Sequence, residues 1–225
     1  MNMRTNSTLG YKGRIISLLF VGTLILFVRT VVIHQYGEMP HKFPIPAIIA
    51  FIVAWQIGKS YDKTLYLSMK DTLTNLYNRR FVLNKFDSLA KYATNKGLKI
   101  AILVSDVNDF KNINDHYGHE YGDKVLLNIA KSLLNSFNRR DIIARWGGDE
   151  FLILSVYKNE EAINTKISNF QSTISQLSSN AQMKSITLSI GKATYPTDHT
   201  NLEELIAIAD ANMYEIKLNY KEKNN

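Results

Sequence analysis

The stretch "DIIARWGGDEFLILSVY", from Asp141 to Tyr157, contains two short apolar runs separated by a pair of glycines. Runs of this length, rich in β-branched and aromatic residues, are typical of buried strands. A Gly-Gly pair between them predicts a β-hairpin, because glycine accepts the positive φ of a tight turn and leaves the backbone bare. The glycines lead directly into Asp149 and Glu150, which point to opposite faces if the backbone there is extended.

The segments on both sides of this hairpin alternate between helical and strand patterns. Apolar residues recur at helical spacing in four segments: 78–97, 122–137, 160–177 and 202–221. Gly97 is placed to cap the first of these helices. Short apolar runs at 99–107 and 184–194 predict two further strands. The pattern predicts an α/β (α+β) domain with a ferredoxin-like βαββαβ core, in which helices pack on an antiparallel sheet.

Two apolar stretches, residues 15–33 and 43–58, precede this domain. As helices they would span about 28 Å and about 24 Å, so the first matches a bilayer core and the second is short for one. We expect a transmembrane helical hairpin within residues 1–60. A cleaved signal peptide is the alternative, but no convincing small-residue cleavage site follows the first stretch.

The net charge of +7 is concentrated in the N-terminal part of the chain. Residues 1–64 hold seven Lys and Arg against two Asp and Glu, whereas the remainder holds twenty against eighteen. This near balance argues against a nucleic-acid partner. Basic residues before the first apolar stretch and after the second predict a multi-pass protein of the cell membrane, in contact with the lipid bilayer, with both termini cytoplasmic.

A second acidic cluster lies in "SDVNDFKNINDHYGHEYGD", residues 105–123. Asp106 ends the apolar run 99–107, and ligands of α/β folds gather beyond strand ends. An EF-hand calcium loop is excluded, because Phe110 and Lys111 stand where that loop needs a ligand and a glycine. A thiolate metal site is excluded too, since the chain has no cysteine. Acids at these two places suit hard cations or proton transfer, and a solvated acidic turn is the alternative for the hairpin.

Together these segments resemble the GGDEF-domain diguanylate cyclases. The matching stretches are "DTLTNLYNRR", "DVNDFKNINDHYGHEYGDKVL", "ARWGGDEFLIL", "TLSIG" and "ADANMYEIK", in the family's order. Five ordered motifs are far more specific than one pentapeptide. The resemblance implies a fold similar to the palm domain of polymerases and adenylyl cyclases. We therefore expect a GGDEF domain at 71–225, a helical linker at 61–70 and a membrane anchor at 1–60.

The resemblance also implies a reaction in which two GTP give cyclic di-GMP and two pyrophosphates. It implies Mg²⁺ as the cofactor, with Mn²⁺ as the alternative ion, bound by Asp106, Asp149 and the backbone carbonyl of Val107, with Glu150 completing the site. Either Asp149 or Glu150 is the base for the ribose 3′-hydroxyl, and the sequence does not choose between them. Each subunit would hold one GTP, so turnover needs a homodimer.

Further positions match residues that hold the nucleotide in this family. The phosphate-binding positions are Lys111, Arg145, Lys217 and Lys221, and Lys111 is grouped with the catalytic acids. Gly147 and Gly148 would let the triphosphate come close. For each lysine the structural alternative is a solvated surface charge, above all for Lys221, which follows Tyr220 where the family often has Gly-Arg.

Asn114 and Asp123 match the family's guanine-binding pair. A carboxylate accepts hydrogen bonds from N1–H and the 2-amino group of guanine, whereas adenine would present a lone pair to it. The structural alternatives are a helix cap for Asn114 and the first helical turn for Asp123. His119 lies in the same run and is expected to line the nucleotide site.

Two positions depart from the family pattern. In "NRRD", residues 138–141, Asn138 replaces the first Arg of the family's inhibitory RxxD site, while Asp141 is present. A neutral amide cannot supply a charged bidentate fork, so the sequence predicts weak product inhibition. Asn75 stands where the family has Gly, and it tolerates a left-handed backbone.

Two functions of different class remain in view. The first is an active, membrane-tethered diguanylate cyclase. The second is a catalytically silent GGDEF-like nucleotide receptor or membrane scaffold. Retention of Asp106, Lys111 and both hairpin acids favours the enzyme, and the degraded product site argues against a receptor.

Overall fold

The computed structural model describes residues 11–37, 45–179 and 186–224, apart from the side chains of 177–179 and 223–224. The chain divides into two compact units, residues 1–69 and 70–225, and each is described by itself. Two expected segments extend beyond the described residues: positions 43–44 of the second apolar stretch and positions 184–185 of the last strand.

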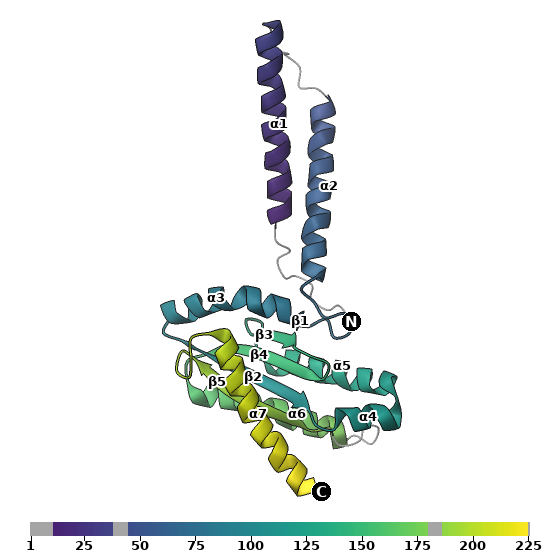
Figure 1. The fold of residues 1–225 in the computed structure, drawn as a ribbon, viewed down its shortest axis with the longest axis vertical. Coiled ribbons are helices and arrows are strands. Elements are labelled where there is room, and N and C mark those ends of the chain that lie inside the picture. The colour runs from purple at the N-terminus through teal and green to yellow at the C-terminus, as the bar shows by residue number, and fades with distance from the viewer. Residues whose placement is uncertain (1–10, 38–44, 180–185, 225) are drawn as a thin grey trace. The chain divides into compact units, whose positions relative to one another are not determined.

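The first unit consists of two helices, α1 (Lys12–Tyr36) and α2 (Ile45–Leu67), which lie side by side (Figure 1). Small residues allow the close approach: a Cβ on Gly58 would lie 2.5 Å from Arg14 Cα. Most large apolar side chains of both helices are exposed. Among the described residues, α1 alone is long and apolar enough to cross a membrane, by length and composition.

Polar contacts join the first turns of α1 to the middle and the C-terminal half of α2. The buried Asp62 carboxylate accepts a hydrogen bond from the Gly13 backbone N–H at 2.8 Å and pairs with Arg14 Nε at 3.2 Å. Ser17 Oγ donates to the Ala54 carbonyl at 2.8 Å. These contacts set the two helices antiparallel, with the start of α1 beside the end of α2.

The second unit is built on a five-stranded sheet in the order β1-β3-β4-β2-β5. The strands are β1 (Tyr77–Asn78), β2 (Lys99–Val107), β3 (Ile142–Arg145), β4 (Glu150–Tyr157) and β5 (Leu188–Tyr195). The predicted antiparallel pairing is confirmed for all four longer strands, because β4 pairs with both β2 and β3, and β5 pairs with β2. The sequence did not predict β1, which pairs parallel to β3, because two residues are too short to carry a pattern.

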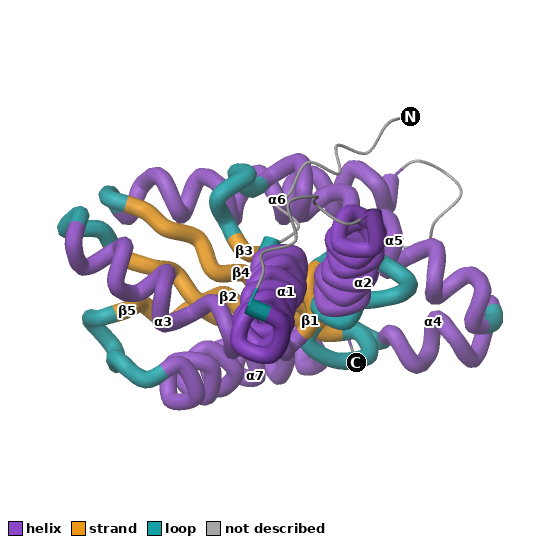
Figure 2. The backbone as a smooth tube through the Cα atoms, turned by 90° about the horizontal axis from the view of Figure 1, so that it is seen from above, coloured by secondary structure: helices purple, strands orange, loops and turns teal. Residues whose placement is uncertain are grey.

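Helices cover both faces of the sheet (Figures 1 and 2). The helices are α3 (Arg79–Asn95), α4 (Phe110–Tyr117), α5 (His119–Ser136), α6 (Glu160–Ser179) and α7 (Leu202–Asn224). Along β2, Ala101 and Leu103 pack with α5 and α6, whereas Ile100 and Ile102 pack with α3 and α7. This alternation explains why β2 reads as a continuous apolar run: both of its faces are buried.

Local predictions at two turns are confirmed. Gly97 follows the end of α3 with a φ of 60°, the left-handed conformation that favours glycine after a helix. Asn75, which stands where the family has glycine, has a φ of 57°, so it adopts the left-handed backbone that asparagine tolerates.

The predicted hairpin joins β3 and β4, but the positive φ expected of its glycines is wrong. Gly147 and Gly148 are not among the described glycines with positive φ. Arg145 pairs with Phe151, and the Trp146 N–H bonds to the Glu150 carbonyl at 2.8 Å, so the connection is longer than a two-residue turn. A longer loop turns the chain without left-handed residues. A Cβ on Gly147 would lie 2.7 Å from Glu150 Oε2, at the end of a flexible side chain, whereas one on Gly148 would meet open space.

Candidate active site

Three acids gather at one end of the central strands. Glu150 pairs with Asp106 across β4 and β2, and the Val107 N–H bonds to the Asp149 carbonyl at 3.3 Å. Asp106 is buried, and Lys217 from α7 places its ammonium 2.6 Å from Asp106 Oδ1. The sheet register therefore brings the acid that ends β2 beside the two acids of the hairpin.

The electrostatics of this cluster are unbalanced toward negative charge. Burial raises the pKa of Asp149, and the neighbouring Asp106 carboxylate raises it further. Burial also raises the pKa of Glu150, with Asp106, Asp149 and Asp210 adding to the effect and Lys217 opposing it. The charges of Lys217 and Arg145 do not fully offset these effects on Asp149, so the cluster keeps a negative potential that favours a bound cation.

The donor set fits a magnesium ion better than a metal caged by protein alone. Within the described ranges, no three His, Asp or Glu side chains lie close enough to hold a metal ion. Magnesium is usually held by one or two carboxylates together with substrate phosphates and water. Asp106 and the two hairpin acids provide such carboxylates. Burial, and then the charge of the neighbouring Asp106, raises the pKa values of Asp149 and Glu150.

A hollow of about 200 Å³ opens beside the acids. Five of the residues singled out in the sequence line it: Val107, Lys111, Asp149, Lys217 and Lys221. Asp109, the N-cap residue of α4, also lines it, and its side chain makes no capping hydrogen bond. The first amides of α4 therefore lack a side-chain acceptor from their cap, and together with three lysines they suit a phosphate group.

The expected guanine-binding residues lie between α4 and α5. Asn114 is an interior residue of α4 and not its cap, and its side chain packs against Gly122, where a Cβ would collide with Oδ1. Asn114 Oδ1 is buried without a hydrogen-bond partner. His119 and Asp123 are exposed on the first turns of α5. A buried acceptor without a partner is costly, so this oxygen is a candidate contact for a ligand donor.

Arg145 does not line the hollow, although the sequence predicted a phosphate-binding role for it. Its guanidinium donates to the Gly148 carbonyl from Nε at 3.1 Å and from Nη2 at 2.7 Å. Nη1 lies 3.2 Å from the Asp71 carboxylate. Sequence reasoning did not single out Asp71, although it begins the motif "DTLTNLYNRR".

The candidate inhibitory segment is already bonded within the domain. Asp141 is buried and accepts hydrogen bonds from the Asn138 backbone N–H and from Lys166 Nζ, both at 2.8 Å. Lys166 also donates to Ser155 at 2.8 Å. Arg139 and Asn138 are exposed. The Asp141 charge is therefore satisfied by a lysine of α6.

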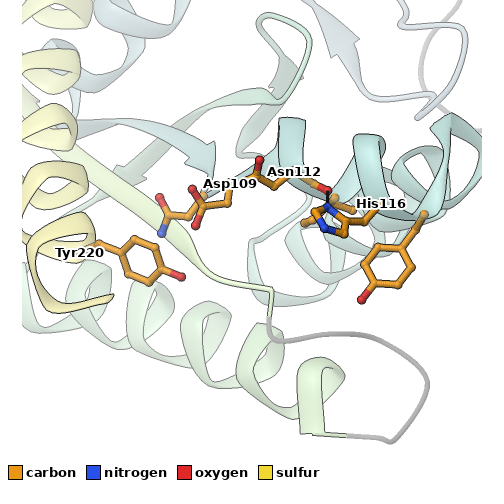
Figure 3. A pocket seen from close by; sticks show the side chains of 7 residues that line it. Asp109, Asn112, His116 and Tyr220 are labelled. Atoms are coloured by element: carbon orange, nitrogen blue, oxygen red, sulfur yellow. Dashed lines mark hydrogen bonds between the residues drawn. The ribbon is translucent and has the colours of Figure 1, made fainter. Parts of the chain in front are cut away.

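A second hollow, about 310 Å³, shares Asp109 and Asn112 with the first. Figure 3 shows these two residues and His116 on one side and Tyr220 of α7 on the other. His116 Nδ1 lies 3.0 Å from the Asn112 carbonyl. The sequence did not predict this hollow, because its residues meet only when the end of α7 approaches α4.

Comparison with known proteins identifies the family of the second unit. The model of the family "Diguanylate cyclase, GGDEF domain" matches residues 68–223. The chain is 32% identical over 168 residues to the response regulator PleD of Caulobacter vibrioides, covering 72% of this chain and 36% of PleD. It is 33% identical over 147 residues to the diguanylate cyclase DosC of Escherichia coli, covering 64% of this chain and 32% of DosC.

A solved structure agrees with these relatives. The GGDEF domain of TpbB (YfiN) from Pseudomonas aeruginosa superposes with a TM-score of 0.61 at 32% identity, covering 67% of this chain and 89% of that one. The chain spans about a third of the length of the curated relatives it matches. Because the family model covers more than half of the 225 residues, and the motif acids meet at one end of the matching sheet, the chain belongs to the GGDEF-domain family.

Proposed function

We propose that this chain is a diguanylate cyclase that condenses two GTP into cyclic di-GMP and releases two pyrophosphates. The observation that carries the proposal is the meeting of Asp106, Asp149 and Glu150 beside a hollow lined by lysines. Phosphoryl transfer needs this combination, because negative charge on the triphosphate must be neutralised while the attacking oxygen is positioned.

The lysine-lined hollow is the proposed triphosphate site. Lys111, Lys217 and Lys221 reach it from α4 and α7, and Phe110 and Asn112 at the start of α4 line the same hollow. Amides at a helix N-terminus favour anions, and ammonium groups add charge-assisted hydrogen bonds. Lys217 would exchange its contact with Asp106 for a phosphate when substrate binds.

Asp106, Asp149 or Glu150, and the Val107 carbonyl would hold the magnesium ion. When bound, the ion supplies charge neutralisation at the phosphates and activation of the 3′-oxygen. The raised pKa values of Asp149 and Glu150 suit one of these carboxylates to accept the 3′-hydroxyl proton.

Asn114 and Asp123 are the proposed guanine contacts. The buried, unpartnered Oδ1 of Asn114 supports this assignment, because a donor on the base would satisfy it. The Asp123 carboxylate would accept from the N1–H edge, which adenine lacks. His119 lies on the same exposed surface of α5 and would line the nucleotide.

The reaction requires two copies of the chain. In each half-reaction a 3′-oxygen forms a bond to the α-phosphorus of the other GTP, and the bond from that phosphorus to pyrophosphate breaks. The hydroxyl proton passes to a hairpin carboxylate. Since each proposed site holds one triphosphate, a homodimer brings the two nucleotides face to face.

We further propose that residues 1–60 anchor the protein in the cell membrane as two spans, that 61–70 form the linker and that 71–225 form the cyclase domain. The exposed apolar side chains of α1 and α2 support this, as does the Asp62 contact that sets the start of α1 beside the end of α2. Both termini would be cytoplasmic, where GTP is available. A reporter fused after Asn225 should resist external protease in intact cells, and its digestion there would contradict the two-span topology.

The activity is tested with the full chain in detergent, GTP and Mg²⁺, with the product identified by mass. We expect cyclic di-GMP from the natural chain and none above background from Asp149→Asn. Nucleotide binding without turnover by the natural chain would replace the enzyme with the silent receptor.

A further inference from the structure

The segment that opens the second unit is bonded to the hairpin that carries two of the acids. Lys70 forms an antiparallel bridge with Tyr77, and the Asp71 N–H bonds to the Leu76 carbonyl at 2.9 Å. Leu76 is only 2% exposed and anchors this loop in the core. The loop is therefore a fixed support rather than a loose connection.

Within this loop the Asp71 carboxylate is held in one orientation. Its Oδ1 accepts from the Thr74 N–H at 2.7 Å and from Thr74 Oγ1 at 2.6 Å. Partial burial alone would raise the pKa of Asp71, but the bonds from Thr74 and the charge of Arg145 lower it. Asp71 is thus an oriented anion at neutral pH.

Arg145 connects this anion to the acidic turn. Nη1 faces Asp71 at 3.2 Å, while Nε and Nη2 both donate to the Gly148 carbonyl. The Arg145 side chain is 17% exposed, so it is mostly buried, although its bonds to Gly148 lie at the surface. The planar guanidinium serves both partners at once, which a lysine could not do.

The contact to Gly148 fixes the peptide that precedes Asp149. The next carbonyl, that of Asp149 itself, accepts from the Val107 N–H at the end of β2. Two consecutive carbonyls are thus held, one by Arg145 and one by β2. These two contacts fix the backbone on either side of the Asp149 Cα, and with it the direction of the Cα–Cβ bond.

We infer that Asp71 is a positioning residue of the active site, which orients Arg145 so that its guanidinium holds the Gly148–Asp149 turn in the reactive geometry. The inference rests on the proposed cyclase function for its kinetic consequence, but its structural part does not. Asp71 touches neither the hollow nor the acids, so its effect on the reaction passes through Arg145. Without the carboxylate, Arg145 can leave Gly148 and move toward Asp149 or a phosphate.

The kinetic test is Asp71→Asn in the full chain in detergent. Asparagine keeps the shape and one acceptor but removes the charge that holds the guanidinium. We expect kcat to fall about ten- to a hundredfold, the effect of a small misplacement, while KM for GTP changes little. A raised KM with unchanged kcat would show that Asp71 acts on substrate binding, and unchanged values of both would also overturn the inference.

A double-mutant cycle tests the route through Arg145. Arg145→Lys keeps the charge and loses the fork, so it should lower kcat as much as Asp71→Asn does. If the two residues act as one unit, the double variant loses no more than the worse single variant. Additive losses would mean that Asp71 acts elsewhere.

Hydrogen exchange provides a readout that needs no catalysis. The Trp146 and Gly147 amides, which bond to the Glu150 carbonyl, should exchange faster in Asp71→Asn without nucleotide. Asp198→Asn is the matched control: Asp198 also holds a turn, accepting from the Thr194 N–H at 2.7 Å near the other end of the sheet. It should affect neither these amides nor kcat.

The two kinds of measurement separate the two proposals. If the natural chain makes no cyclic di-GMP while Asp71→Asn still speeds exchange at the turn, the proposed function fails and the positioning contact stands. If the chain is an active cyclase and exchange at the turn is unchanged in Asp71→Asn, the positioning inference is overturned.

Discussion

The acids at the two ends of the central strands have pKa values shifted in opposite directions. At the end of β2 that holds Asp106, the hairpin acids Asp149 and Glu150 have raised pKa values. At the start of β2, Glu160 pairs with Lys192 at 2.9 Å and accepts from Tyr157 at 2.7 Å. These hydrogen bonds lower the pKa of Glu160.

The difference separates structural acids from acids that await a ligand. Lys99 Nζ also lies 3.6 Å from Glu160 Oε1, so the negative charge of Glu160 is balanced by lysines of the protein itself. Among the described residues, the three acids at the other end have one direct ion pair, between Asp106 and Lys217, and the charges of Lys217 and Arg145 only partly offset the raised pKa of Asp149. Burying several carboxylates together without matching cations destabilises the folded protein. Such a cluster is therefore typical of a functional site, where a bound metal ion or ligand would neutralise it.

The largest expected effect comes from neutralising an acid at the unmatched end. Asp149→Asn should lower cyclic di-GMP formation by about a hundred- to a thousandfold, because it removes an anion needed in the transition state. Asp106→Asn should do the same. The measurement is the initial rate at saturating Mg²⁺.

Glu160→Gln is the matched control at the other end of the strands, and its rate should equal that of the natural chain. Near-normal rates in Asp149→Asn or Asp106→Asn would break the comparison. So would a large loss of activity in Glu160→Gln, because the matched acids would then not be merely structural.

The next effect concerns selectivity for the base. Asp123→Ala should lower the preference for GTP over ATP by about ten- to a hundredfold, which corresponds to the loss of one charged hydrogen bond. The preference is measured as the ratio of kcat/KM for the two nucleotides. Glu120→Ala removes an exposed acid of the same helix and should leave the ratio unchanged. An unchanged ratio in Asp123→Ala would place guanine recognition elsewhere.

Product inhibition should be weak, because both anchors of the usual site are missing or engaged. Asn138 is neutral, and the Asp141 carboxylate is already paired with Lys166. Asn138→Arg adds one charge-assisted bond and should lower the inhibitory concentration of cyclic di-GMP by about tenfold. The measurement is the initial rate against added cyclic di-GMP.

Asp141 thus resembles the matched acid Glu160 more than the acids of the hairpin. Tight inhibition of the natural chain that is unaffected by Asn138→Arg but lost in Arg139→Ala or Arg140→Ala would show a shifted arginine at work. The alignment of this site with the family pattern would then be wrong.

The sequence predicted the architecture well, because the pattern of apolar residues is dictated by the two buried faces of the sheet. The four antiparallel strands, the helix that ends before Gly97 and the left-handed Asn75 all follow from local chemistry. The helix α4 was not predicted, because its eight residues are mostly polar and lie inside the motif assigned to chemistry. Short elements held by tertiary contacts leave no periodic signal.

The candidate site was predictable as a set of residues but not as a set of contacts. The motifs named the acids and the lysines, and the hollow brings Lys111, Lys217 and Asp149 together. The bond of Arg145 to Asp71 was not predictable, because it joins residues 74 positions apart that a parallel strand of two residues brings together. The positive φ expected of the two glycines was also wrong, because it assumed a shorter turn than the one that joins β3 and β4.

The smallest expected effect is on stability, and its sign differs between the two ends. A carboxyl with a raised folded pKa stabilises the protein most when protonated, and this stability is lost as pH rises from the ordinary carboxyl range through the folded pKa. Asp149→Asn, without metal or nucleotide, should therefore raise Tm at pH 7 by about 2–4 °C.

Glu160 has a lowered pKa, so its contribution is present above the ordinary carboxyl pKa and is lost as pH falls through the folded value. Glu160→Gln should lower Tm at pH 7 by about 1–3 °C, because its ion pairs are exposed. Both differences should shrink toward pH 4, and they are measured by thermal unfolding of the full chain in detergent with EDTA. Equal signs at pH 7 would show that the two ends of the strands do not differ in electrostatic balance.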